Sequence, residues 1–186
     1  MTKARHADTV IQINGCIHRA AISPETMSHV CVVNTSDPAS INGVVAMLRR
    51  LEELPPQTRI VFTRNLAFYW LKSFAAWLAN PDGLRCFLPF TTDLGRGNET
   101  VSFLATCLLE AEMLRAGMPP RNMPSTGMVA YYWLTKKLQP GDSLDIAGFT
   151  FEGWDRHPWE VERNIIKGVY PPGYRADPSY EKRMTV

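Results

Sequence analysis

Short runs of consecutive apolar residues alternate with helical patterns along this chain, and that alternation limits the folds open to it. Residues 30–33 read V-C-V-V, residues 59–63 read R-I-V-F-T, and residues 9–13 form a shorter run, T-V-I-Q-I. Strands that are apolar at consecutive positions are typical of a sheet covered on both faces. The sequence therefore predicts an α/β fold with a mostly parallel sheet and helices on both faces.

Apolar residues at intervals of three and four predict the helices between these strands. The aromatic side chains within residues 66–78 and 128–134 follow this spacing and are expected to face the core. The predicted helices cover residues 41–51, 66–78, 99–116, 124–138 and 159–169, and two further short strands cover residues 86–88 and 143–149.

The helix predicted over residues 99–116 has a signal at each end. Asn98 is the expected cap and Gly117 the expected stop. Leu104 and Leu108 are expected to face the core from this helix.

Length and composition describe a globular chain and exclude several classes of protein. The 186 residues are 45% hydrophobic and 20% charged, as in one ordinary folded domain. We assign residues 1–170 to that domain and residues 171–186 to an extended, proline-rich tail. A net charge of +2 indicates neither a nucleic-acid partner nor a membrane surface. No apolar run reaches the roughly 18 residues of a membrane span. The opening residues, M-T-K-A-R-H-A-D-T-V, lack the apolar core of a signal peptide, which predicts a cytoplasmic protein.

The cysteines are scattered and contain no C-x-x-C pair. This spacing predicts neither a disulfide framework nor a zinc site, and no metal is expected. The four cysteines are Cys16, Cys31, Cys86 and Cys107.

A small polar turn, P-S-T-G, opens the helix predicted over residues 124–138. The backbone amides and the dipole at a helix N-terminus favour an anion, and the hydroxyls of Ser125 and Thr126 add donors beside Gly127. The same four residues also suit a plain serine cap on a buried helix. The turn is therefore a candidate phosphate site, with the structural cap as its alternative.

His157 lies in W-D-R-H-P-W-E-V-E, just before the last predicted helix. A histidine beside aromatic residues and carboxylates is a candidate general base, and a solvent-facing loop histidine is the alternative. Asn14 and Asn34 each follow an apolar strand, where their amides can hydrogen-bond a base or a ribose. Asparagine is also a common turn residue, so this assignment stays open as well.

Three short motifs, taken in order, resemble glycosyltransferase family 29, the sialyltransferases. P-S-T-G at the start of a helix, followed by a strand that ends G-F, resembles the small sialyl motif of that family. Residues 7–16, A-D-T-V-I-Q-I-N-G-C, resemble the end of the large sialyl motif. Residues 157–166, H-P-W-E-V-E-R-N-I-I, resemble the histidine-bearing third and very small motifs. The likeness is closest to short bacterial members of the family.

The resemblance implies an inverting, metal-independent transferase in a Rossmann-like variant of the A-type glycosyltransferase fold. Its donor would be a CMP-activated sugar, bound as a substrate, and its acceptor a glycan or a small molecule. No other cofactor is implied, and His157 is the implied base. The residues expected at the nucleotide are Asn14, Asn34, Ser125, Thr126, Gly127, Gly148 and Phe149.

The chain also departs from the family pattern, which keeps a second class of function open. Gln12 stands where the family has an arginine, and His157 is the only histidine in a region where the family uses two. Little chain precedes Asp8, so either the start lies upstream of Met1 or the fold lacks the family's first strand. The alternative is a non-catalytic accessory or nucleotide-binding protein that retains the fold. Without a first strand, residues 9–13 would form a sheet edge, which a homo-oligomer would cover.

Overall fold

A computed structural model describes the chain in several stretches. They are residues 10–13, 27–32, 35–36, 56–79, 88–89, 97–140, 142, 144, 151–152 and 156–168. The chain divides into two compact units, Met1–Thr106 and Cys107–Val186.

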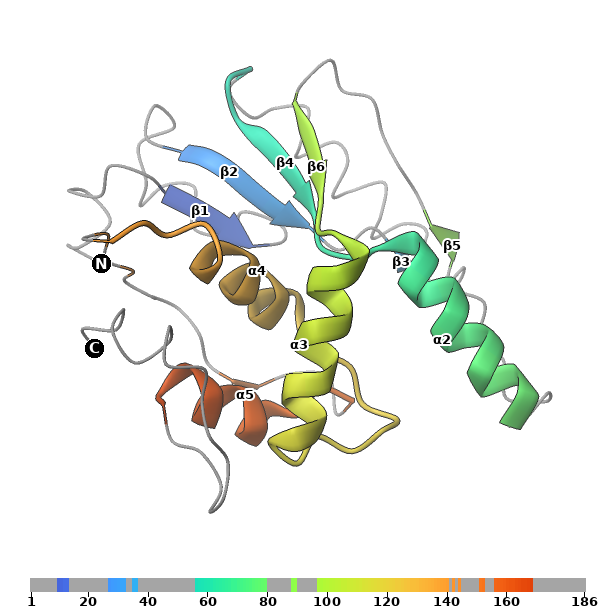
Figure 1. The fold of residues 1–186 in the computed structure, drawn as a ribbon. Helices are drawn as coiled ribbons and strands as arrows, with labels where there is room; N and C mark the ends of the chain where they lie inside the picture. The colour runs from blue at the N-terminus through green and yellow to red at the C-terminus, as the bar shows by residue number, and fades with distance from the viewer. Residues whose placement is uncertain are drawn as a thin grey trace. The chain divides into compact units, whose positions relative to one another are not determined.

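The first unit contains a parallel sheet of four strands, which lie side by side and run in the same direction (Figure 1). In the two inner strands, the runs Val30–Val32 and Ile60–Phe62 are buried at every position, as expected for a sheet covered on both faces. The predicted α/β class with a parallel sheet is confirmed at this level. The strands, in spatial order, are β1 (Val10–Ile13), β2 (Met27–Val32), β4 (Arg59–Phe62) and β6 (Asn98–Thr100), and each neighbouring pair is parallel.

Strand β1 stands at one edge of this sheet. Among the described strands it pairs only with β2, where Ile13 lies opposite Cys31. An edge position for residues 9–13 was expected only if the fold lacks the family's first strand, and that condition stays untested by the described residues.

A second, two-stranded sheet pairs β3 (Thr35–Ser36) with β5 (Leu88–Pro89) in antiparallel register. Strand β5 overlaps the end of the strand predicted over residues 86–88. The helix predicted over residues 41–51 lies outside the described residues. So does the strand predicted over residues 143–149, except for Leu144, which has no regular secondary structure.

Helix α2 (Leu66–Ala79) follows β4 and matches its predicted range. Asn65 caps it, because the side-chain oxygen of Asn65 accepts a hydrogen bond from the amide of Phe68 at 3.3 Å. The expected orientation of the aromatic side chains was wrong for Trp70, which is 71% exposed, and for Phe74, which is also exposed and stacks on Trp70. The helix is apolar on nearly every side, so spacing alone could not identify the face that is buried.

Helix α3 (Phe103–Arg115) begins later than predicted. Residues 98–100 form β6 instead of a helical first turn, because they pair with β4. Ser102 is the cap, and its hydroxyl oxygen accepts from the amide of Ala105 at 3.2 Å. The expected burial of Leu104 and Leu108 was wrong as well, because both are exposed, Leu104 to 66%. Leu109 and Met113 are buried instead, on a different face of the helix.

Gly117 ends α3 as predicted. Its φ is 99°, in the left-handed region that glycine adopts without strain. The amide of Met118 donates to the carbonyl of Met113 at 2.9 Å, and the amide of Gly117 donates to the carbonyl of Leu114 at 3.1 Å. This pair of bonds is the Schellman arrangement, which satisfies carbonyls at a helix C-terminus.

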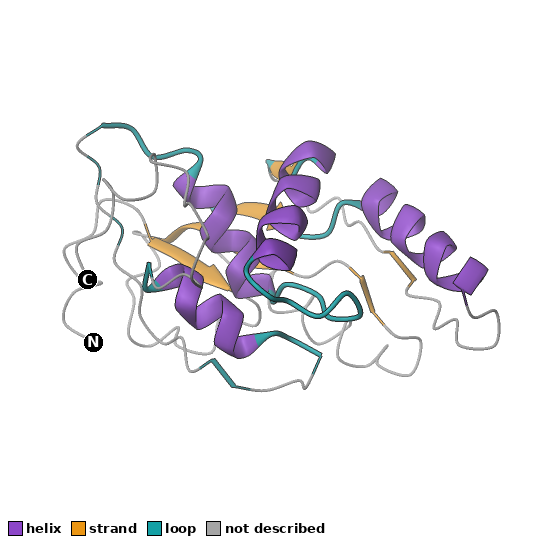
Figure 2. Ribbon diagram, turned by 60° about the horizontal axis from the view of Figure 1, so that its bottom comes forward, coloured by secondary structure: helices purple, strands orange, loops and turns teal. Residues whose placement is uncertain are grey.

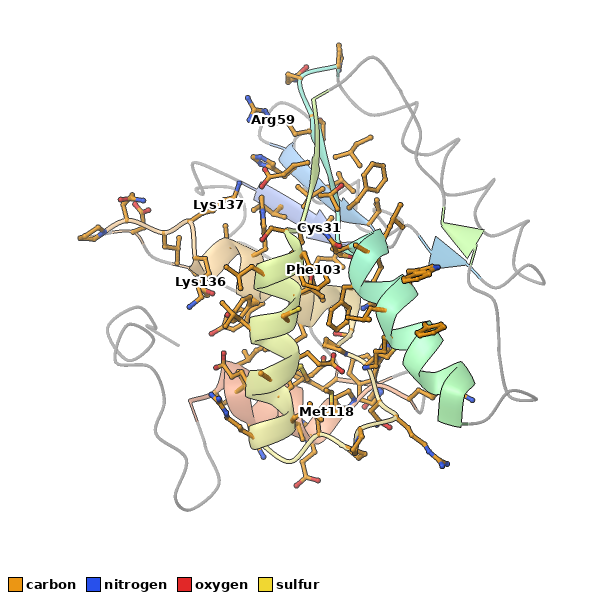
Figure 3. The ribbon with its side chains drawn as sticks, turned by 45° about the vertical axis from the view of Figure 1, so that its right-hand side comes forward. Cys31, Arg59, Phe103, Met118, Lys136 and Lys137 are labelled. Atoms are coloured by element: carbon orange, nitrogen blue, oxygen red, sulfur yellow. The ribbon has the colours of Figure 1, made fainter. Side chains whose placement is uncertain are left out.

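The second unit contains two further helices, α4 (Thr126–Thr135) and α5 (Trp159–Ile166), which also appear in Figure 2. The expected burial of the aromatic residues in α4 is confirmed for Tyr131, Tyr132 and Trp133. Lys136 and Lys137 follow the helix (Figure 3), and their ammonium groups lie over the rings of Tyr132 and Trp133, at 5.1 and 4.3 Å from the ring centroids. These lysines suit the negative end of the helix dipole.

Replacement of Gly117 by alanine tests the end of α3. An added Cβ would meet nothing within 4 Å, so only the left-handed backbone is strained. We expect Gly117→Ala to lower the free energy of unfolding by about 1 kcal/mol, measured by urea denaturation. Gly117→Asn is the matched control and should lose less, because asparagine tolerates this conformation. Equal stability of Gly117→Ala and the wild type would contradict the assignment.

Candidate functional site

The P-S-T-G turn begins helix α4, and Ser125 is its N-cap residue. The backbone of Ser125 is extended, with φ −66° and ψ 161°, and its hydroxyl oxygen accepts from the amide of Met128 at 3.1 Å. The carbonyl of Ser125 accepts from the amide of Val129 at 3.0 Å. The structural alternative weighed for this turn, a serine cap on a buried helix, is therefore present.

The carboxylate of Glu162 in α5 faces the same turn. One oxygen of Glu162 accepts from the backbone amide of Ser125 at 2.7 Å, and the other accepts from the Ser125 hydroxyl at 2.6 Å. The second distance lies in the range of hydrogen bonds from a hydroxyl to an ionised carboxylate. The side chain of Glu162 is 0% exposed. A buried carboxylate thus interacts with the positive end of α4, where negative charge is favoured.

His157 is attached to the segment that leads into this turn. Its Nδ1 lies 2.8 Å from the carbonyl oxygen of Met123. A carbonyl can only accept, so Nδ1 carries the proton, and in the neutral ring Nε2 carries the lone pair. The ring of His157 is partly buried and meets the ring of Trp159 edge-on, with 5.0 Å between the ring centroids.

Four hydrogen bonds therefore join two segments that are distant in the sequence but belong to the same unit. A backbone bond from the amide of Met123 to the carbonyl of Arg156, at 3.1 Å, completes the set. The first segment contains the small polar turn, and the second contains H-P-W-E-V-E. The structure brings His157 and the start of α4 into one bonded cluster, as a histidine base beside an anion site requires.

Thr126 and Gly127 are the first two residues of α4, and their backbone amides belong to its first turn. None of the described residues accepts a hydrogen bond from either of them. They are the donors that an oxyanion would use at a helix N-terminus. Thr126 is 7% exposed and Gly127 is buried, so both residues are largely excluded from solvent.

The other residues expected at the nucleotide are Asn14, Asn34, Gly148 and Phe149, and all four lie outside the described residues. Glu162 lies within the motif H-P-W-E-V-E, for which only the histidine had a predicted role. The signal that could have identified it is its position in the first turn of a helix that the histidine precedes.

Polar residues that follow strand β4, in the first unit, hydrogen-bond to backbone carbonyls of the same unit. The hydroxyl of Thr63 donates to the carbonyl of Val32 at 3.0 Å, and the side-chain amide of Asn65 donates to the carbonyl of Val101 at 3.1 Å. The buried guanidinium of Arg64 lies 5.1 Å from the ring centroid of Tyr69. These polar side chains thus make contacts within the first unit.

Within the described stretches, no group of three or more His, Cys, Asp or Glu side chains is arranged to hold a metal ion. The described helices include none that is both long and apolar enough to cross a membrane.

Comparison of the chain with protein-family models, with curated proteins and with solved structures finds no match.

Removal of the His157 side chain tests the bond to Met123. We expect His157→Ala to lower the free energy of unfolding by about 1 kcal/mol, the value of one hydrogen bond. His157→Asn should recover part of this loss, because the asparagine side-chain nitrogen occupies a position like that of Nδ1. Chemical denaturation of both variants measures the difference. Equal loss in the two variants would show that the bond contributes nothing.

Proposed function

We propose that this chain is a glycosyltransferase-like protein that binds CMP or a CMP-activated sugar, with a sialyltransferase-like, inverting mechanism. The observation that carries the proposal is the hydrogen bond from His157 Nδ1 to the carbonyl of Met123. This bond attaches the candidate base to the turn that opens α4, and it leaves the basic lone pair on Nε2 of the neutral ring. The order of the P-S-T-G and H-P-W-E-V-E motifs along the chain supports the same function.

The proposed reaction assigns one task to each part of the cluster. Nε2 of His157 takes the proton of an acceptor hydroxyl, whose oxygen attacks the anomeric carbon of the donor sugar. The bond from that carbon to the phosphate oxygen breaks, and CMP leaves with the electron pair. The amides of Thr126 and Gly127, with the dipole of α4, stabilise the charge on the leaving phosphate. The sugar configuration inverts because one displacement occurs.

The sheet supports a Rossmann-like arrangement as part of this proposal. Its strands follow one another across the sheet in chain order, as they do in one half of a doubly wound fold. The roles of Asn14, Asn34, Gly148 and Phe149 at the nucleotide stay predictions.

A non-catalytic accessory or nucleotide-binding protein is the second candidate, and one observation favours it. The carboxylate of Glu162 already takes the amide and the hydroxyl of Ser125. The phosphate of a donor would meet a negative charge at the same helix end, within a buried turn. On this alternative the cluster holds the fold together and transfers no sugar.

Titration calorimetry against nucleotides tests the binding proposal. We expect CMP to bind the full chain at least about tenfold more tightly than UMP, a difference of about 1.4 kcal/mol. The physical reason is that a cytosine pocket would leave a polar group without its partner when uracil binds. GMP and AMP serve as controls for binding to phosphate alone. Absence of binding by every cytidine nucleotide would reject this function.

Product analysis with CMP-sialic acid and mixed acceptors separates the two candidates. We expect transfer by the wild type and a loss of at least about 100-fold in His157→Asn, the usual contribution of a general base. Asparagine is used in place of alanine because it can keep the hydrogen bond to Met123, so that a loss of transfer does not reflect a loss of folding. Nucleotide binding without any transfer by the wild type would favour the accessory protein.

A further inference from the structure

Two adjacent peptide groups connect the buried carboxylate of Glu162 to the ring of His157. The carbonyl of Met123, which accepts from His157, belongs to the peptide group before Pro124. The amide of Ser125, which donates to Glu162, belongs to the peptide group after Pro124. Because peptide groups are planar, only the φ and ψ angles of Pro124 relate the two orientations.

One of those two angles is fixed by the proline ring, which holds φ near −65°. A single soft torsion, ψ of Pro124, therefore separates the carbonyl at His157 from the amide at Glu162. Pro124 is itself buried, which restricts its surroundings further.

Ser125 holds its own peptide group in place from the other side. Its hydroxyl donates to Glu162 at 2.6 Å while accepting from the amide of Met128. Rotation of the Ser125 amide would break its bond to a buried carboxylate, and an unmet hydrogen bond is costly in the interior of a protein.

We propose that Glu162 is a positioning residue for His157: it acts through Ser125 and Pro124 to aim the carbonyl of Met123, which sets the tautomer of the imidazole. The carboxylate thereby keeps the proton on Nδ1 and the lone pair on Nε2. The role of Nε2 as a base rests on the proposed function. The tautomer does not, because it exists with or without a substrate.

The side-chain nitrogen signals of His157 test this inference without any ligand. We propose two-bond ¹H–¹⁵N NMR correlation spectra of the labelled full chain, at a pH where the imidazole is neutral. The chain has four histidines, and the signal of His157 is the one lost in His157→Asn. In the wild type we expect Nδ1 at the shift of a protonated nitrogen and Nε2 at that of an unprotonated one.

Glu162→Gln is the decisive variant. The amide side chain keeps the size of glutamate but replaces one of its two acceptor oxygens with a donor, so the amide and the hydroxyl of Ser125 can no longer each donate to a separate oxygen. We expect the Nδ1 signal to move toward the average of the two tautomers. Glu160→Gln is the matched control, because Glu160 is exposed in the first turn of the same helix. In this variant the Nδ1 signal of His157 should match that of the wild type. Pro124→Ala, which releases φ, should give an intermediate shift.

An unchanged Nδ1 signal in Glu162→Gln would overturn the inference, as would an equal shift in Glu160→Gln. If Glu162→Gln does not fold, Ser125→Ala gives the same test. It removes the hydroxyl bond, keeps the amide bond to Glu162, and should give a smaller shift in the same direction; no shift would again overturn the inference. A failure of CMP to bind would reject the proposed function and leave this result standing, so the two failures are distinguishable.

Discussion

The contact between Glu162 and Ser125 is the interaction on which the second unit depends. It places a carboxylate that is 0% exposed against the amide and the hydroxyl that begin α4. A buried charge is tolerated only with close hydrogen-bonding partners, and here the dipole of α4 adds to them. This contact joins α4, which begins at the small polar turn, to α5, which follows His157. The position of His157 beside Met123 is consistent with this bracing.

The same contact explains why the site permits two interpretations. A helix N-terminus attracts an anion whether that anion is a ligand or a side chain. The hydroxyl and the amide of Ser125 both donate hydrogen bonds to Glu162, so neither donor is left for a ligand. Within the described part of this turn, the amides of Thr126 and Gly127 have no acceptor and are the donors that a phosphate could use. A transferase and an accessory protein would share this architecture and differ in what reaches those two amides.

Sequence patterns were reliable where one physical cause dominated. Consecutive apolar residues in Val30–Val32 and Ile60–Phe62 identified inner strands, because only strands covered on both faces bury every residue. Gly117 identified the end of α3, because few residues other than glycine adopt a φ of 99°. The patterns failed in α2 and α3, where apolar residues occur on several faces. Leu104 and Trp70 fit a helical stripe, but the buried faces contain Leu109 and Tyr69.

The sequence by itself determined the α/β class, offered a serine cap at Ser125 as one of two interpretations of its turn, and placed a histidine before the last helix. Each follows from local chemistry: strand patterning, a hydroxyl at a helix start, and a proline at position 158. Only the tertiary structure decided that Glu162 meets Ser125, across 37 positions of sequence separation, and that His157 bonds to Met123 across 34. Such contacts depend on how helices pack, and neither spacing nor composition encodes which carboxylate reaches which amide. The candidate histidine was therefore found in the sequence, while its hydrogen bond to Met123 was decided by packing.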